Sequence, residues 1–305
     1  MTHGTPSNVA ASVRARLLQL SKAREEDFTL TLMNFAAERF LFRLSRSRCR
    51  DQFVLKGAML FAVRIGERYR PTRDLDLLGT GEPTEEAVAK AVREIVTTPT
   101  DDDGVVFDVE SLQVFPIRQD DRYGGIRAVL DAHLAAARIH VQIDIGFGDA
   151  ITPAATDLEF PTLLADMPAP RVFAYPTETI IAEKVEAMVD LGISNSRMKD
   201  FADVAMAARR LAFDGSILVE AMRATFGRRR TPLPDTDMGP LSAEFVQDAN
   251  AQRNWKAFAS RNGVREFDSL AHVVDELRVF LARPLALART RDPFGARWEP
   301  GGPWR

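Results

Sequence analysis

The strongest constraint on the fold is a change of periodicity halfway along the chain. Up to about residue 150, short alternating apolar segments interleave with amphipathic helical segments. A proline-containing segment, 153–176, follows, and beyond it apolar residues recur at helical spacing almost to the end. This order predicts an α+β fold with two lobes, in which a mixed-sheet lobe precedes a mostly helical lobe.

The same patterns predict individual elements and domain limits. We expect an α/β lobe with leading helices at 1–150, a connector at 151–176, and a helical lobe at 177–305. The final residues, 291–305, read as a loosely held tail. Strands are predicted at 52–55, 74–79, within 101–117, and at 127–135 and 139–148. Helices are predicted at 7–20, 25–44, 57–65, 83–96, 177–191, 197–211 and 216–226, with two or three more after these.

Composition limits the class of protein. A net charge of −3 argues against a uniformly basic surface, although 40 Lys and Arg residues could still form a local basic groove. The single cysteine, Cys49, excludes an intramolecular disulfide and fits a reducing compartment. No stretch approaches the roughly 20 apolar residues of a membrane span. We therefore expect a soluble, cytoplasmic protein with no membrane partner.

The segment RDLDLLG places two carboxylates in front of an apolar run. Alternation along a strand sends Asp74 and Asp76 to the same face. Two neighbouring carboxylates repel each other, and Arg73 supplies only one positive charge against their two negative charges. A divalent cation would relieve the repulsion, and hard oxygen ligands suit Mg²⁺. The alternative is a solvated strand edge that carries an incidental acid pair.

A second signal is Lys56-Gly57, where a predicted strand gives way to a predicted helix. Glycine permits close approach of the backbone, and a helix N-terminus presents unsatisfied N–H groups. This combination is typical of a phosphate-binding loop.

A third acid lies in the segment HVQIDIGFGD. Asp144 faces away from the apolar residues Val141, Ile143 and Ile145. A carboxylate within an apolar strand rarely lacks a partner. It could be a further metal ligand, a base for the attacking hydroxyl, or half of an ion pair with an arginine.

Charged residues also cluster on the predicted helices of the second half: Lys184, Arg197, Lys199, Asp200 and Asp203. The cations could contact a triphosphate, or the whole set could be a surface salt-bridge network. A basic surface for an acceptor RNA could come from residues 228–230 with Arg253 and Trp255, and the alternative there is a solvated loop.

Taken together, KGAMLF, TRDLDLLG, VQIDIGFGD, YPTETIIAEKVEAM and RMKDFADV resemble the AbiEii/MenT-type nucleotidyltransferase toxins, within the DNA polymerase β-like superfamily. The resemblance covers about residues 53–210. The superfamily's usual Gly-Gly or Gly-Ser is Gly57-Ala58 here, so a hydroxyl contact to the phosphates is absent.

The resemblance implies roles for particular residues. Asp74 and Asp76 match the metal-binding acids, and Asp144 matches the third acid position. Lys56 and Gly57 match the loop that contacts the phosphates, and Lys184 matches a catalytic lysine. Lys199, Asp200 and Asp203 match a Lys-Asp-x-x-Asp motif in which Asp200 or Asp203 is expected to be essential. Arg73 and Arg197 are expected to help bind the nucleotide.

The resemblance also implies an activity and partners. The expected reaction transfers a nucleotide from an NTP, a pyrimidine nucleotide among the candidates, to the 3′ end of tRNA. Mg²⁺ or Mn²⁺ would be the cofactor, and a cognate antitoxin would neutralise the toxin. Two other hypotheses remain: a phosphotransferase that modifies a protein serine or itself, and an inactive module that binds RNA or a partner.

Overall fold

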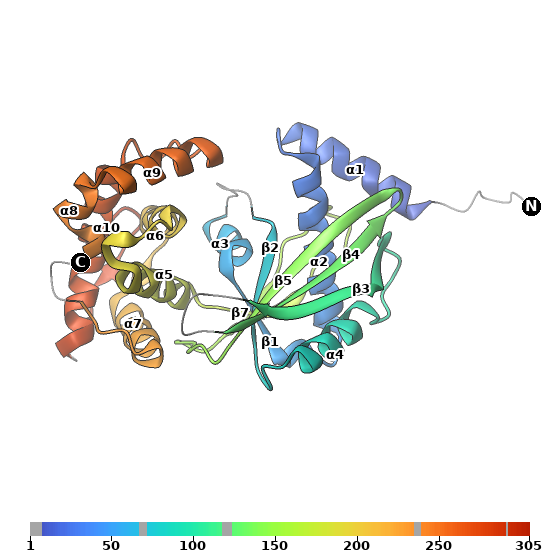
Figure 1. Cartoon of the computed structure of the whole chain (residues 1–305), viewed down its shortest axis with the longest axis horizontal. Helices are drawn as coiled ribbons and strands as arrows, with labels where there is room; N and C mark the ends of the chain where they lie inside the picture. Colours follow the sequence, from blue (N-terminus) through green and yellow to red (C-terminus); the bar gives the residue numbers. More distant parts are fainter. Residues whose placement is uncertain (1–7, 67–71, 118–123, 235–238, 291) are drawn as a thin grey trace, which may run out of the picture. The chain divides into compact units, whose positions relative to one another are not determined.

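A computed structural model of the chain describes residues 8–66, 72–117, 124–234, 239–290 and 292–305 (Figure 1). The chain forms two compact units. We call the first the sheet unit: Met1–Leu60, Thr72–Gly148 and Thr156–Ala174. The second is the helical unit: Phe61–Pro71, Asp149–Ala155 and Tyr175–Arg305. The predicted α+β class, with a mixed sheet and a mostly helical second part, is confirmed.

The sheet unit is organised around one mixed sheet of seven strands in the order β3-β4-β5-β2-β1-β7-β6. Its strands are β1 (Phe53–Lys56), β2 (Asp74–Gly79), β3 (Val105–Ile117), β4 (Gly125–Leu134), β5 (Ala137–Phe147), β6 (Thr156–Glu159) and β7 (Arg171–Ala174). Strand β2 lies in the middle, antiparallel to β1 and parallel to β5. The strand that carries the Asp-Leu-Asp motif therefore has a neighbour on each side.

Helices cover one face of this sheet. They are α1 (Val9–Ala23), α2 (Phe28–Arg46) and α4 (Glu85–Val96), and a 3₁₀ turn, η1 (Arg50–Gln52), precedes β1. Helix α2 packs on β5 and β7, and α4 packs on β3 and β4 (Figure 1). Asp27 and Thr84 cap α2 and α4, because their side-chain oxygens accept hydrogen bonds from backbone N–H groups of the first turn.

Alternation along the strands gives the sheet one buried face and one more polar face. On β4 and β5, side chains such as Ala128 and Ile143 are fully buried on the face that carries the helices. The intervening residues, among them Arg127, Gln142 and Asp144, belong to the opposite face. We call this opposite face the open face.

The helical unit is built from α5 (Thr177–Leu191), α6 (Met198–Arg210), α7 (Gly215–Arg229), α8 (Ala243–Gln247), α9 (Ala249–Asn262) and α10 (Leu270–Thr290), with 3₁₀ turns η2 (Gly192–Ser194) and η3 (Gly239–Leu241). Helix α3 (Gly57–Ile65) begins in the sheet unit and continues into the helical unit. Aromatic packing joins the helices, as where Phe201 of α6 stacks on Phe245 of α8 with ring centroids 5.3 Å apart. In the part of the chain that is described, no helix is long and apolar enough to cross a bilayer.

The segment expected to be a connector contains two strands. Strands β6 and β7 are each four residues long, and they pair with each other in an antiparallel register. Strand β7 also pairs in parallel with β1. Runs this short are difficult to recognise from alternation, and their pairing with β1 depends on contacts distant in sequence.

The expectation of a loosely held C-terminal tail was wrong. Within 292–305, β9 (Arg297–Trp298) pairs with β8 (Phe213–Asp214). Trp298 is only 3% exposed, and its indole Nε1 donates a hydrogen bond to the carbonyl oxygen of Ala208 at 2.6 Å. Trp304 stacks on Phe280 of α10. Large aromatic side chains hold this glycine- and proline-rich segment in place.

Candidate active site

Five side chains form one row across the open face of the sheet unit. Cross-strand pairing joins Lys56 of β1 to Asp76 of β2, and Asp76 to Asp144 of β5. Asp144 is paired in turn with Arg127 of β4, and Arg127 with Phe115 of β3. Directly paired residues point to the same face of a sheet. The row therefore reads Phe115, Arg127, Asp144, Asp76 and Lys56, and we call it the active-site row.

Asp74 extends the row along β2. It lies two residues before Asp76 and is paired with Gln142 of β5, so both aspartates lie on the open face. Alternation along the strand predicted this shared face. Arg73, which directly precedes β2, is exposed.

Gly57 brings the start of α3 against Asp76. Its φ angle is +70°, in the left-handed region that glycine adopts without strain. A Cβ atom at this position would lie 1.9 Å from Oδ2 of Asp76 and 2.5 Å from its Cβ. No other residue fits here without movement, so the glycine allows the backbone at the helix N-terminus to approach the carboxylate.

Asp144 is engaged by an arginine that the sequence analysis did not single out. Arg127 donates Nε and Nη2 hydrogen bonds to the two carboxylate oxygens, each at 2.7 Å. The hydrogen bond to Asp144, with further contributions from the charges of Asp74 and Asp76, raises the pKa of Arg127. The ion-pair alternative for Asp144 is therefore present, and Arg127 offsets part of the negative charge in the row.

In the helical unit, Lys184 joins two buried carboxylates. From α5 its Nζ donates to Oδ1 of Asp200 at 2.9 Å and to Oδ2 of Asp203 at 2.6 Å, both on α6. The lysine side chain is 13% exposed, whereas Asp200 and Asp203 are 1% and 0% exposed. The i and i+3 spacing on α6 places both acids on the face that meets α5.

The environments of the two acids push their pKa values in opposite directions. Burial raises the pKa of Asp203 well above its usual range. Burial also acts to raise the pKa of Asp200, but the charges of Lys184 and Arg197 outweigh it and hold this pKa below its usual value. Asp200 is therefore the ionised member of the pair, and Asp203 is the member better suited to carry a proton.

The remaining predicted phosphate-contacting residues lie at the start of α6. Arg197 directly precedes the helix, and its Nε lies 2.9 Å from Oδ2 of Asp200. Lys199 is exposed in the first turn. The structure thus gathers Lys184, Arg197, Asp200 and Asp203 into one cluster, the lysine cluster, with Lys199 beside it.

The expected acceptor surface around 228–230 and Trp255 was wrong for two of its members. Arg229 donates to Oε2 of Glu186 at 2.7 Å and lies 3.4 Å from Asp149. Although burial acts to lower the pKa of Arg229, the surrounding carboxylates raise it, so its charge is used within the protein. Trp255 is 5% exposed and packs against Phe258 and Phe267. Its ring cannot stack on a nucleotide in this arrangement.

The described part of the chain contains no group of three or more His, Cys, Asp or Glu side chains arranged to hold a metal ion by themselves. Mg²⁺ does not need such a cage, because it is usually bound by one or two carboxylates together with water and substrate phosphates. Two aspartates on one strand face fit that donor set.

A match to a protein-family model identifies the class of protein to which this chain belongs. A model of the "Nucleotidyl transferase AbiEii toxin, Type IV TA system" family matches residues 39–276, which is more than half of the chain and includes both groups of side chains. The chain is therefore a nucleotidyltransferase. It belongs to the AbiEii family of type IV toxin–antitoxin systems, as the motifs predicted.

Other comparisons are more distant. No curated protein matches the chain significantly. A crystal structure described as "putative nucleotidyltransferase from H. pylori" is 13% identical, with a TM-score of 0.46 over 84% of this chain and 93% of that one. JHP933 from Helicobacter pylori is 15% identical, with a TM-score of 0.42 over 84% of this chain and 90% of that one.

Proposed function

We propose that the chain transfers a nucleoside monophosphate from an NTP to the 3′ acceptor end of tRNA in a Mg²⁺-dependent reaction, and that a cognate antitoxin restrains it. The observation that carries the proposal is the active-site row, in which Asp76 meets the glycine at the start of α3 and lies beside Asp74. The tRNA target and its 3′ end come from the resemblance of the motifs to the family.

The two aspartates of β2 would hold the metal. Asp74 and Asp76 offer carboxylate oxygens on one face, and the triphosphate would complete the coordination. When bound, Mg²⁺ or Mn²⁺ supplies positive charge against the charge that develops on the transferring phosphate and on the leaving pyrophosphate. Asp144 would serve as a third ligand or as a base only after releasing the hydrogen bonds from Arg127.

The chain's own donors would bind the phosphates. The N-terminus of α3, entered through Lys56 and Gly57, presents backbone N–H groups and the positive end of the helix dipole. Lys199, which is exposed in the first turn of α6, would neutralise the pyrophosphate as it leaves. Lys184 and Arg197 would contribute to this only after releasing their contacts to Asp200 and Asp203. The raised pKa of Asp203 suits it to hold a proton close to Lys184.

The proposal is tested by an in vitro transfer assay. The purified chain is incubated with Mg²⁺, total tRNA and each α-³²P-labelled NTP in turn. Matched variants are Asp76→Asn, which removes one proposed ligand charge, and Glu110→Gln, which removes an exposed charge on β3. We expect label on tRNA with one or two NTPs, lost in Asp76→Asn and retained in Glu110→Gln.

Two results would count against the proposal. Transfer that survives in a folded Asp76→Asn variant would exclude the proposed metal-binding role of Asp76. No label on tRNA from any α-labelled NTP would exclude tRNA as the acceptor under these conditions. A γ-labelled NTP and a protein gel would then test the phosphotransferase alternative.

A further inference from the structure

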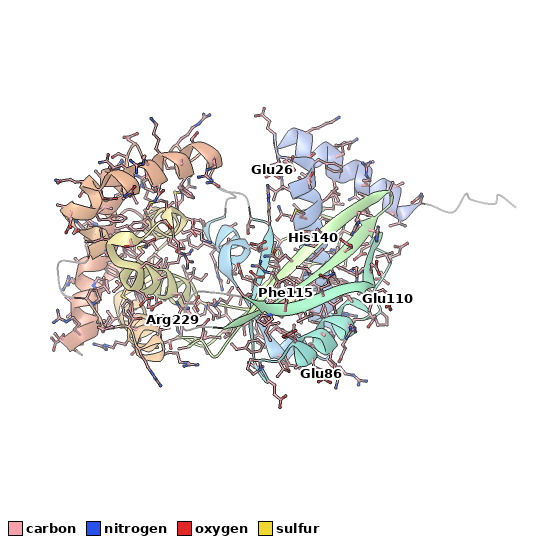
Figure 2. The ribbon with its side chains drawn as sticks, viewed as in Figure 1. Glu26, Glu86, Glu110, Phe115, His140 and Arg229 are labelled. Carbon is pink, nitrogen blue, oxygen red and sulfur yellow. The ribbon has the colours of Figure 1, made fainter. Side chains whose placement is uncertain are left out.

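The active-site row ends in an exposed aromatic side chain. Phe115 lies on β3, at the edge of the sheet (Figure 2). Its side chain is 39% exposed. It is paired directly with Arg127, whose guanidinium is fixed by Asp144. A single exposed apolar residue is ordinary on a protein surface. What distinguishes Phe115 is its position in the same row as Asp144 and Asp76.

The spacing of strands sets the separation. Adjacent strands are about 4.8 Å apart, and three intervals separate Phe115 from Asp76, so their backbones are roughly 14 Å apart along the row. The side chains project on the same face, and Arg127 and Asp144 occupy the positions between them. A nucleotide with its phosphate near Asp76 could direct its base across the row towards Phe115.

The chemistry of the row favours an unpaired nucleobase over an apolar partner surface. An aromatic ring beside a guanidinium plane is a stacking surface for any base, because every base has a π face. On the open face beside Phe115, Gln113 of the same strand is exposed. Ile117 and Val129 also lie on this face next to Phe115, and both are partly buried. The other large exposed apolar residue on the described sheet, Val106, lies at the far end of β3 (66% exposed). The two do not form a continuous apolar patch.

We propose that Phe115 is a base-stacking residue that holds an unpaired nucleobase beside the catalytic acids. The inference rests on the proposed nucleotidyl transfer and adds to it a specific contact for the base. The same stacking chemistry would serve the base of the donor NTP or the unpaired terminal base of the acceptor RNA, and the experiment separates these two sources.

The test measures binding without turnover. Two probes contain 2-aminopurine, whose fluorescence falls when it stacks: the riboside triphosphate, and a short single-stranded RNA with the probe at its 3′ end. Each is titrated separately, so no transfer can occur. The variants are Phe115→Ala, Phe115→Leu and Phe115→Trp, and Val106→Ala is the matched control on the same strand and face.

We expect one probe to be quenched by the wild-type chain and by Phe115→Trp. The dissociation constant for that probe should rise about 5- to 150-fold in Phe115→Ala, the range expected for losing one stacked base. Phe115→Leu should not restore binding, because it keeps apolar bulk but lacks the π face. Val106→Ala should behave as wild type. Quenching of the triphosphate assigns the site to the donor, and quenching of the RNA assigns it to the acceptor.

Equal binding and equal quenching of both probes by the wild-type chain and Phe115→Ala would overturn the inference. So would a Phe115→Ala variant that loses antitoxin binding while both probes remain unaffected, because the ring would then be a protein contact. The proposed function is tested by a different measurement, the loss of transfer in Asp76→Asn. Its failure can therefore be told apart from failure of the stacking proposal. Phe115-dependent quenching without any transfer would support the stacking site and contradict the proposed nucleotidyl transfer.

Discussion

Replacing Gly57 by alanine tests whether the close approach of α3 to Asp76 positions the active site. The new Cβ would lie 1.9 Å from Oδ2 of Asp76 and 2.5 Å from its Cβ, so the side chain and the local backbone must move. Alanine at a φ of +70° costs about 1–2 kcal/mol. Overpacking of this kind adds roughly 1–3 kcal/mol. Displacement of a catalytic group by about 1 Å can lower a rate about 100-fold.

Gly66 provides a matched control at the other end of the same helix. Its φ angle is +75°, but a Cβ there would meet no atom of the described residues within 4 Å. Gly66→Ala therefore carries the same backbone strain without the clash. We expect Gly57→Ala to be less stable than Gly66→Ala by about 1–3 kcal/mol, and only Gly57→Ala to lose transfer activity.

A double-mutant cycle with Asp76→Gly isolates the clash, because this change removes the carboxylate and its Cβ together. Urea unfolding gives the stability of each variant, and the tRNA-labelling assay gives the rates of Gly57→Ala and Gly66→Ala. The extra destabilisation of Gly57→Ala should disappear in the Asp76→Gly background. If Gly57→Ala matches Gly66→Ala in stability and keeps wild-type transfer, the contact between α3 and Asp76 does not position the active site.

Other variants test the remaining groups. Lys184→Met should cost about 3–5 kcal/mol, because it leaves Asp200 and Asp203 buried without the ammonium. Burial already raises the folded pKa of Asp203, and without Lys184 the folded pKa of Asp200 loses the largest charge that lowers it. A carboxyl group whose folded pKa is raised contributes stability below its unfolded pKa, and this stability is lost as pH rises. The deficit of the variant in urea midpoints should therefore be larger at about pH 8 than at about pH 5, and an equal deficit would contradict this. Mg²⁺ at about 100 times its Kd should stabilise the wild-type chain by about 2.7 kcal/mol in thermal unfolding. An equal shift in Asp76→Asn would show that the ion binds elsewhere. Trp298→Ala should cost about 3–5 kcal/mol in urea unfolding, whereas no change would mean that the tail is not held.

The parts of the site that local sequence determines could be predicted. The run from Asp74 to Gly79 was expected as a strand with both aspartates on one face, and β2 has these limits. The glycine at the junction of strand and helix predicted the start of α3. Both features depend on alternation and backbone preference within a few residues, which a sequence displays directly.

Which residue pairs with Asp144 depends on the register between β4 and β5, and this register could not be predicted from the sequence. Arg127 reaches Asp144 because β4 and β5 pair outward from a turn at Ala135 and Ala136. Hairpin turns with positive φ usually contain glycine or asparagine, but here Ala135 adopts a φ of +51°. Without that chemical signal the strands could be recognised but not aligned. A slip of one residue would have placed Arg127 on the opposite face.

The same dependence on register explains why the stacking role of Phe115 emerges only from the folded chain. In sequence, Phe115 lies 39 residues from Asp76, in a strand whose pattern is interrupted by a bulge between Asp108 and Gln113. Counting from the start of β3 across that irregularity would assign the phenylalanine to the wrong face. Three consecutive strand pairings bring it into the row with the acids. The catalytic acids are thus defined by a local motif, whereas the surface beside them is defined by the pairing of distant strands.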